Sequence, residues 1–144
     1  FFVSVMTTNL EPEEMLVEVR FPILPSGSGW AFEEFVLRHG DFAVVGVTAA
    51  VTLNSDQVCT DARLAAIGVD ETAFRDPALE ELLKGAKITD SALEAVGSQL
   101  SEKVDPFDDL HASAAQRKHL VGVLAKRALQ KAANMAVENL KGES

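Results

Sequence analysis

The sequence predicts an α+β fold in which an antiparallel sheet of three to four strands is covered by three helices. Short runs rich in Val, Phe and Thr fill the first half of the 144 residues, with turn residues between them, which is typical of strands. Helix caps and apolar residues at helical spacing fill the second half. No repeat and no long linker divides the chain, so we expect one core.

The composition excludes several classes of protein. A chain that is 47% hydrophobic and 24% charged has an ordinary globular balance. Its net charge of −9 argues against nucleic acid or an anionic membrane as a partner, because both require a basic face. No segment approaches the roughly 20 apolar residues of a membrane helix, so we expect no membrane insertion.

The single cysteine, Cys59, excludes an internal disulfide and a cysteine-based zinc or iron–sulfur site within this chain. It also fits a reducing compartment, so we expect a cytoplasmic protein. The opening stretch "FFVSVMTTNL" has no basic leader and is not predicted to be a signal peptide. Its apolar start, without Met, suggests a piece of a longer protein.

Four segments of the first half are predicted to be strands. In Met15–Phe21, apolar side chains alternate along one side of an extended backbone. A Pro- and Gly-rich loop follows over 22–29. Trp30–Leu37 could form a strand or one short helix, and its aromatic residues favour the strand. Phe42–Leu53 and Val58–Val69 are separated by a short turn, which predicts an antiparallel hairpin.

Two shorter helices are predicted next. Asp76 is placed as an N-cap with Pro77 at the first helical position, and Gly85 lies past the end of that helix. The second spans Thr89–Val104, with Ser91 and Glu94 at the spacing of a capping box. A loop is expected over Asp105–His111.

The last predicted helix is the longest. Ser113 and Gln116 have capping-box spacing at its start. Its apolar stripe comprises Leu120, Val121, Leu124, Ala128, Ala132 and Met135. Its basic residues lie largely outside that stripe: Arg117, Lys118, Lys126, Arg127 and Lys131. They could form an anion site, but a solvated or ion-paired helix face is the better interpretation.

No self-contained catalytic set is found. The three histidines are far apart, and no nucleophile–base pair or Gly-rich nucleotide motif occurs. A buried, inert thiol is the favoured interpretation of Cys59. The Gly/Ser stretch at 26–29 could contact a phosphate, but a plain connection between strands is favoured. His111 beside Asp108 and Asp109 is interpreted as helix-entry chemistry.

The polar stretch Arg38-His39-Gly40-Asp41 lies between two apolar segments. A turn accounts for Gly40 with a positive φ and for Asp41 hydrogen-bonding the local backbone. A functional interpretation requires a ligand or another chain facing this turn, and neither spacing nor composition supplies one.

Three blocks resemble a known family in order and spacing: "EPEEMLVEVRFP", "GWAFEEFVLRHGDFAVVGV" and "DLHASAAQRKHLVGVLAKRAL". They are similar to the C-terminal domain of the FAD-binding medium subunit of molybdenum hydroxylases, with carbon monoxide dehydrogenase medium subunits closest and xanthine dehydrogenase more distant. The opening "FFVSVMTT" resembles the family's boundary between the FAD-binding domain and this domain, with Ser4 where glycine is usual. The resemblance covers essentially all 144 residues.

The resemblance implies a fold that agrees with the prediction above, and a role. Residues 1–12 would be the end of the FAD-binding domain or an inter-domain linker, and 13–144 the C-terminal α+β domain. This domain would close over the flavin ring of FAD, which an upstream domain mostly holds. FAD would pass electrons from [2Fe-2S] clusters of a small subunit to an external acceptor, while a large subunit holds molybdopterin.

The resemblance also implies cofactor-binding residues. Met15 and Leu16 match an apolar position near the flavin ring. Glu33 lies where the xanthine dehydrogenase branch has a lysine near the flavin, so the charge is reversed. Arg38 and Asp41 match the Arg-x-x-Asp of a loop beside the flavin, and Phe42 follows it. No catalytic or metal-ligating residue is expected here.

A second hypothesis from another class is a non-catalytic interaction or dimerisation domain of a flavoprotein, which would use the sheet face or the last helix. An autonomous enzyme is the least favoured, because the chain has no complete catalytic set.

Overall fold

A computed structural model describes residues 1–142 of the chain. Its main sheet has three antiparallel strands in the order β3-β4-β5, namely β3 (Ser28–Phe35), β4 (Val45–Leu53) and β5 (Cys59–Ile67). Three helices follow: α1 (Pro77–Glu81), α2 (Asp90–Lys103) and α3 (Ala114–Gly142). The predicted fold class is confirmed, as are three of the four predicted strands and the antiparallel pairing of β4 with β5.

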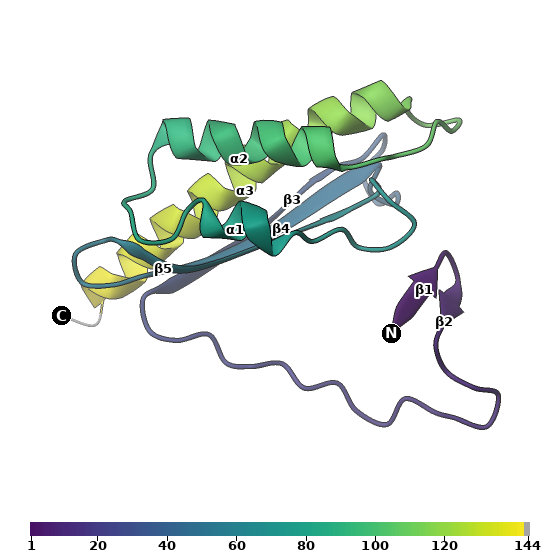
Figure 1. Cartoon of the computed structure of the whole chain (residues 1–144), viewed down its shortest axis with the longest axis horizontal. Helices are drawn as coiled ribbons and strands as arrows, with labels where there is room; N and C mark the ends of the chain where they lie inside the picture. Colours follow the sequence, from purple (N-terminus) through teal and green to yellow (C-terminus); the bar gives the residue numbers. More distant parts are fainter. Residues whose placement is uncertain (143–144) are drawn as a thin grey trace.

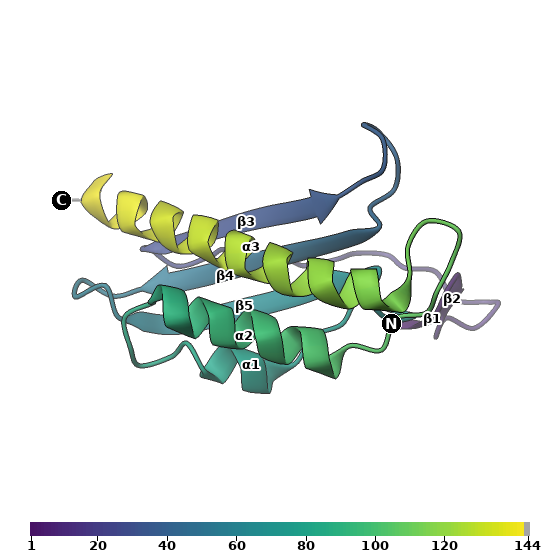
Figure 2. The same ribbon diagram turned by 90° about the horizontal axis from the view of Figure 1, so that it is seen from above.

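The helices lie on one face of this sheet (Figure 1). The long helix α3 runs across β3 and β4, and α2 lies beside it (Figure 2). The short helix α1 packs against β5. None of the helices within residues 1–142 combines the length and hydropathy that crossing a bilayer requires.

The core lies between the sheet and α3. Every second residue of the central strand β4 faces it, and Val45, Val47 and Val51 are fully buried. Small residues on α3, among them Ala132, let the helix backbone approach the sheet closely. The approach is so close that a side chain on Gly29 would lie 2.1 Å from the Ala132 carbonyl oxygen.

Most predicted helix caps are confirmed. Asp76 accepts a hydrogen bond from the Ala78 N–H with Pro77 at the first helical position. Ser113 and Gln116 exchange the two bonds of a capping box. The predicted Ser91–Glu94 box is wrong, because Thr89 is the N-cap of α2 and its hydroxyl accepts from the Ala92 N–H. Thr89 also suits an N-cap, and it extends the helix by one half-turn.

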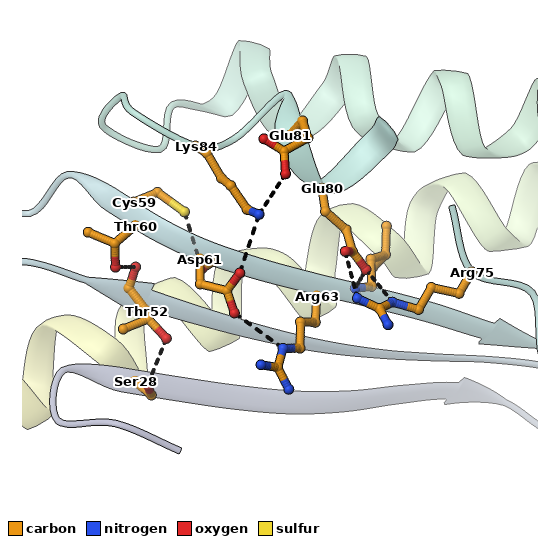
Figure 3. Close-up of polar contacts among 11 residues, drawn as sticks. Ser28, Thr52, Cys59, Thr60, Asp61, Arg63, Arg75, Glu80, Glu81 and Lys84 are labelled. Carbon is orange, nitrogen blue, oxygen red and sulfur yellow. Dashed lines mark hydrogen bonds and ion pairs between the residues drawn. The ribbon is translucent and has the colours of Figure 1, made fainter. Parts of the chain in front are cut away.

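The outer edge of β5 is closed by polar contacts with α1 and its flanks (Figure 3). The buried Glu80 accepts from the Leu64 N–H at 3.0 Å and is held by Arg75. Burial alone raises the pKa of Glu80, but the bonds from Arg75 and Leu64 outweigh it and lower the pKa. Such capping of a strand edge prevents pairing with a further strand.

The first 26 residues form an extended arm outside the packed domain. Two short strands, β1 (Phe2–Ser4) and β2 (Thr7–Thr8), pair with each other and with no other strand of residues 1–142. The predicted strand Met15–Phe21 is wrong, since no strand within residues 1–142 pairs with it. Its alternating pattern fits an extended backbone, and Glu18 and Arg20 do pair on one side of it. A strand also requires a partner edge, which sequence alternation cannot provide.

Candidate functional site

The polar loop, residues 36–44, joins β3 to β4. Its tip is the predicted turn: Gly40 has a φ of +91°, and the Asp41 N–H donates to the Arg38 carbonyl at 3.1 Å. The hydrogen bond of Asp41 to the local backbone is therefore made by its main chain. Neither Arg38 nor Asp41 has a salt-bridge partner among residues 1–142, and Phe42 is 98% exposed. The tip thus presents charge and an aromatic ring to its surroundings.

A buried arginine of α3, Arg117, holds the base of the polar loop. Its Nη1 donates to the carbonyl oxygens of Val44 at 2.5 Å and Gly68 at 2.8 Å, and its Nη2 pairs with Asp109 at 2.6 Å. The contact requires glycine at 68, because a side chain there would lie 2.2 Å from the Val44 oxygen. One side chain therefore joins the start of β4, the end of β5 and the entry to α3.

The sequence interpretation placed Arg117 on a solvated or ion-paired helix face. Its ion pair with Asp109 is confirmed, but its exposure to solvent is wrong. Arg117 is only 6% exposed and lies one helical turn before the buried Val121. The signal was available, because positions 117, 121, 124 and 128 follow the same helical spacing as the apolar stripe. Arg117 is therefore a structural support of the loop. The residue type did not indicate this role, because arginine is usually exposed.

Asp109 completes this support. Its carboxylate accepts from the N–H groups of Ala112 and His111 and from Arg117, which lowers its pKa to about 2. The neighbouring Asp108 accepts from the Ala114 N–H at 2.5 Å. The prediction that these aspartates serve the helix entry is confirmed.

Glu33 faces the helices rather than the polar loop. Its carboxylate pairs with Lys131 of α3, and its side chain is only 16% exposed. The pairing partner explains why a negative residue is accommodated on this face of β3. The structure does not bring Glu33 together with Arg38 and Asp41, and its contact with a flavin stays a prediction.

Met15 and Leu16 lie on the arm and are 77% and 51% exposed. They contact no packed element of the domain within residues 1–142. In both views the β1–β2 hairpin of the arm and the polar loop lie toward the same end of the long axis (Figures 1 and 2). The arm therefore supplies apolar side chains, but not a formed pocket.

A cavity of about 500 Å³ adjoins the polar loop between the end of β3 and the first turns of α3. Its apolar wall includes Phe35, Leu37 and Leu120, and its polar groups are His111, Gln116 and His119. Leu37 lines this cavity and immediately precedes Arg38, so the cavity adjoins the charged tip of the polar loop. A larger groove of about 670 Å³ lies between α2 and α3 and is lined by His119, Lys126 and Arg127 among others.

The polar loop and the arm expose side chains of different kinds. The loop carries an exposed aromatic ring and, within residues 1–142, two charges without salt-bridge partners, and the arm carries exposed apolar side chains. The Gly/Ser stretch is no phosphate cradle, because Asn139 donates to the Ser28 oxygen and Gly29 packs against α3. The favoured interpretation as a connection between strands is only partly right, because residues 28 and 29 already belong to β3 and the stretch joins the arm to that strand.

Two further features concern reactive groups. Cys59 is fully buried, and burial raises the pKa of its thiol, which confirms an inert cysteine. Within residues 1–142 no cluster of three or more His, Cys, Asp or Glu is arranged to hold a metal ion.

The family model described as the CO dehydrogenase flavoprotein C-terminal domain matches residues 30–132. Relatives include the 6-hydroxypseudooxynicotine dehydrogenase complex subunit alpha of Paenarthrobacter nicotinovorans, which is 35% identical over 93% of this chain and 45% of its own length. The caffeine dehydrogenase subunit beta of Pseudomonas sp. (strain CBB1) is 35% identical over 95% and 46%. The chain thus spans about half the length of these relatives.

Solved structures agree with the sequence relatives. Carbon monoxide dehydrogenase from Hydrogenophaga pseudoflava, in a form lacking the Mo-pyranopterin moiety, matches with a TM-score of 0.88 and 32% identity, over 94% of this chain and 47% of that one. Quinoline 2-oxidoreductase from Pseudomonas putida 86 matches with a TM-score of 0.71 and 29% identity, over 76% and 38%. The chain therefore belongs to the family of CO dehydrogenase flavoprotein C-terminal domains, found in the medium subunits of molybdenum hydroxylases.

Proposed function

We propose that this chain is the part of a molybdenum-hydroxylase medium subunit that closes over the flavin ring of FAD. The observation that carries the proposal is the polar loop, whose tip holds two charges without salt-bridge partners while Arg117 fixes its base. A charge that has no partner within its own domain is free to act on a bound group. The family supports this interpretation, since it is described as a flavoprotein domain.

The cofactor residues have distinct roles in this proposal. Arg38 and Asp41 set the local field at the edge of the ring, and Phe42 excludes water from it. Met15 and Leu16 of the arm add apolar contact. Glu33 completes the set only if its pair with Lys131 opens, and it is the weakest member. FAD, when bound, supplies electron transfer from iron–sulfur clusters to an external acceptor.

The partners follow from the same proposal. An upstream FAD-binding domain holds most of the dinucleotide, and the description of the family model as a C-terminal flavoprotein domain supports this. A small subunit carries the [2Fe-2S] clusters, and a large subunit carries molybdopterin and the substrate. Residues 1–12 are the end of the FAD-binding domain or a linker, 13–144 the C-terminal domain, and the complex is cytoplasmic. The relatives, named as subunits or chains of dehydrogenases, do not favour a separate dimerisation domain.

The test is made on the complete multi-subunit protein. Its visible spectrum should show an oxidised flavin, and Arg38→Ala should lower the flavin midpoint potential, because a positive charge stabilises the electron-rich reduced ring. The expected change is on the order of 1 kcal/mol. Arg127→Ala removes the same charge from an exposed position of α3 at the groove with α2 and serves as the matched control. A colourless complex, or equal potentials in the two variants, would contradict the proposal.

A further inference from the structure

No helix or strand within residues 1–142 lies over the second face of the sheet. We name as the open face the outward residues Trp30, Phe32, Thr48, Ala50, Ala65 and Ile67. Their cross-strand register joins Phe32, Thr48 and Ala65 in one row, and the next row contains Trp30, Ala50 and the charged Arg63. Thr48 is exposed although it lies on the central strand, where a neighbouring layer usually covers such a position.

The open face is apolar at its centre, and the outward-facing Glu34, Asp61 and Arg63 border it. An antiparallel sheet with one wet face carries polar residues there. Here Trp30, Phe32 and Ile67 are exposed large apolar side chains, and small residues lie between them. A shallow hollow of about 230 Å³ lies over these small residues and is bordered by Arg63 and Arg75. Contiguous exposed apolar surface of this kind marks a docking site.

Contacts at both outer edges of the sheet hinder the pairing of a further strand. Glu80 and the flanks of α1 close the edge of β5 (Figure 3). On β3, Asn139 donates to the Ser28 oxygen at 2.7 Å and the Trp30 N–H donates to the Met135 sulfur at 3.5 Å. The edge of β5 and the first half of the β3 edge therefore have side-chain or backbone partners, which favours a layer over the face rather than a further paired strand.

The position of the arm indicates which part of the protein covers the open face. It leaves the sheet at Gly27 and runs on the side of the sheet opposite to the helices (Figures 1 and 2). Its side chains Met15, Val17, Val19 and Phe21 are all exposed. A body between the arm and the open face would cover both apolar surfaces at once. This domain is described as C-terminal in its family and spans about half of its relatives, so such a body exists in those proteins.

We propose that the open face is the seat of the flavin-binding half of the same subunit, which lies between the face and the arm. The proposal rests on the proposed function for the identity of that half. Trp30 and Phe32 are the aromatic anchors of the contact, and the hollow over Ala50 and Ala65 receives a side chain from it. The flavin ring then lies at the polar-loop end of this interface.

Hydroxyl-radical footprinting of the complete medium subunit, purified as a monomer, tests the proposal. Phe32 and Phe107 are 47% and 57% exposed in this domain, so they form a matched pair. Phe32 should be labelled at least about fivefold more slowly than Phe107, because interface cores exclude water. Equal labelling of the two rings would overturn the proposal. Protection that disappears on dilution would also overturn it, since it would indicate a second copy as the occupant.

A pair of variants identifies the surface. Thr48→Glu places a charge at the centre of the open face and should raise Phe32 labelling to the level of Phe107. Ser98→Glu places the same charge in the groove between α2 and α3 and should leave Phe32 protected. Continued protection of Phe32 in Thr48→Glu, or loss of its protection in Ser98→Glu, would overturn the proposal. A colourless subunit with Phe32 protected would contradict the proposed function and still support the docking surface.

Discussion

The two faces of the main sheet differ completely, although they are formed by alternate residues of the same strands. Val47 is fully buried beneath α3, whereas its neighbour Thr48 is exposed on the other face. The face under the helices is a finished core, and the open face is apolar at its centre with no helix or strand of residues 1–142 over it. The contrast indicates that the domain holds two of the three layers of its working form, and that the third comes from elsewhere.

The largest effect should separate the neighbours Val47 and Thr48. In the purified 144-residue chain, Val47→Asp places a charge in the core and should cost about 4 kcal/mol or more of unfolding free energy. Thr48→Asp places it on the open face and should cost about 1 kcal/mol or less. Urea unfolding measures both. Similar losses at the two positions would show that both faces are packed and would end the comparison.

Substitution of Arg117, which supports the polar loop, should give the next largest loss of unfolding free energy. Arg117→Met leaves the buried carbonyl of Val44 and the half-buried carbonyl of Gly68 without their donor and should cost about 3 kcal/mol. Hydrogen exchange in residues 36–44 should accelerate as well. Arg127→Met, on the exposed side of the same helix, should cost less than about 0.5 kcal/mol. Equal losses of unfolding free energy in the two variants would show that Arg117 does not hold the loop.

Acid should weaken the same support through Asp109. Its folded pKa of about 2 lies below the ordinary value of 3.8, so the unfolded chain binds the proton first. The contribution is complete above the ordinary value and is lost as pH falls toward about 2. Asp109→Asn should remove this part of the acid dependence. An unchanged profile in that variant would show that the carboxylate is not linked to folding.

The smallest effect should come from the open face in the isolated chain. Trp30→Ala should lower the unfolding free energy by less than about 1 kcal/mol, because its ring has little packed around it. In the complete subunit the same change should cost several times more, since the docked layer would lose an aromatic anchor. A thermal-shift comparison of the two proteins checks this. Equal losses would indicate that nothing docks on the ring.

Local sequence signals were sufficient to predict most elements of the domain. Features that depend on residues distant in the sequence could not be predicted in this way. The caps at Asp76 and Ser113 were predictable because a cap depends on residues within one turn. Met15–Phe21 was misassigned because a strand requires a partner that alternation does not reveal. Arg117 was missed because a buried arginine depends on distant carbonyls, here those of Val44 and Gly68. The candidate site rests on the family resemblance for the same reason.

An experimental structure of the complete subunit with FAD bound would test the central claim most directly. The quantity to measure is the exposure of Trp30, Phe32 and the loop residues Arg38 and Asp41. The account predicts that the flavin-binding half covers both aromatic rings and that the polar loop borders the flavin. An open face and a polar loop that both remain in bulk solvent, with the flavin half seated on α2 and α3 instead, would contradict it.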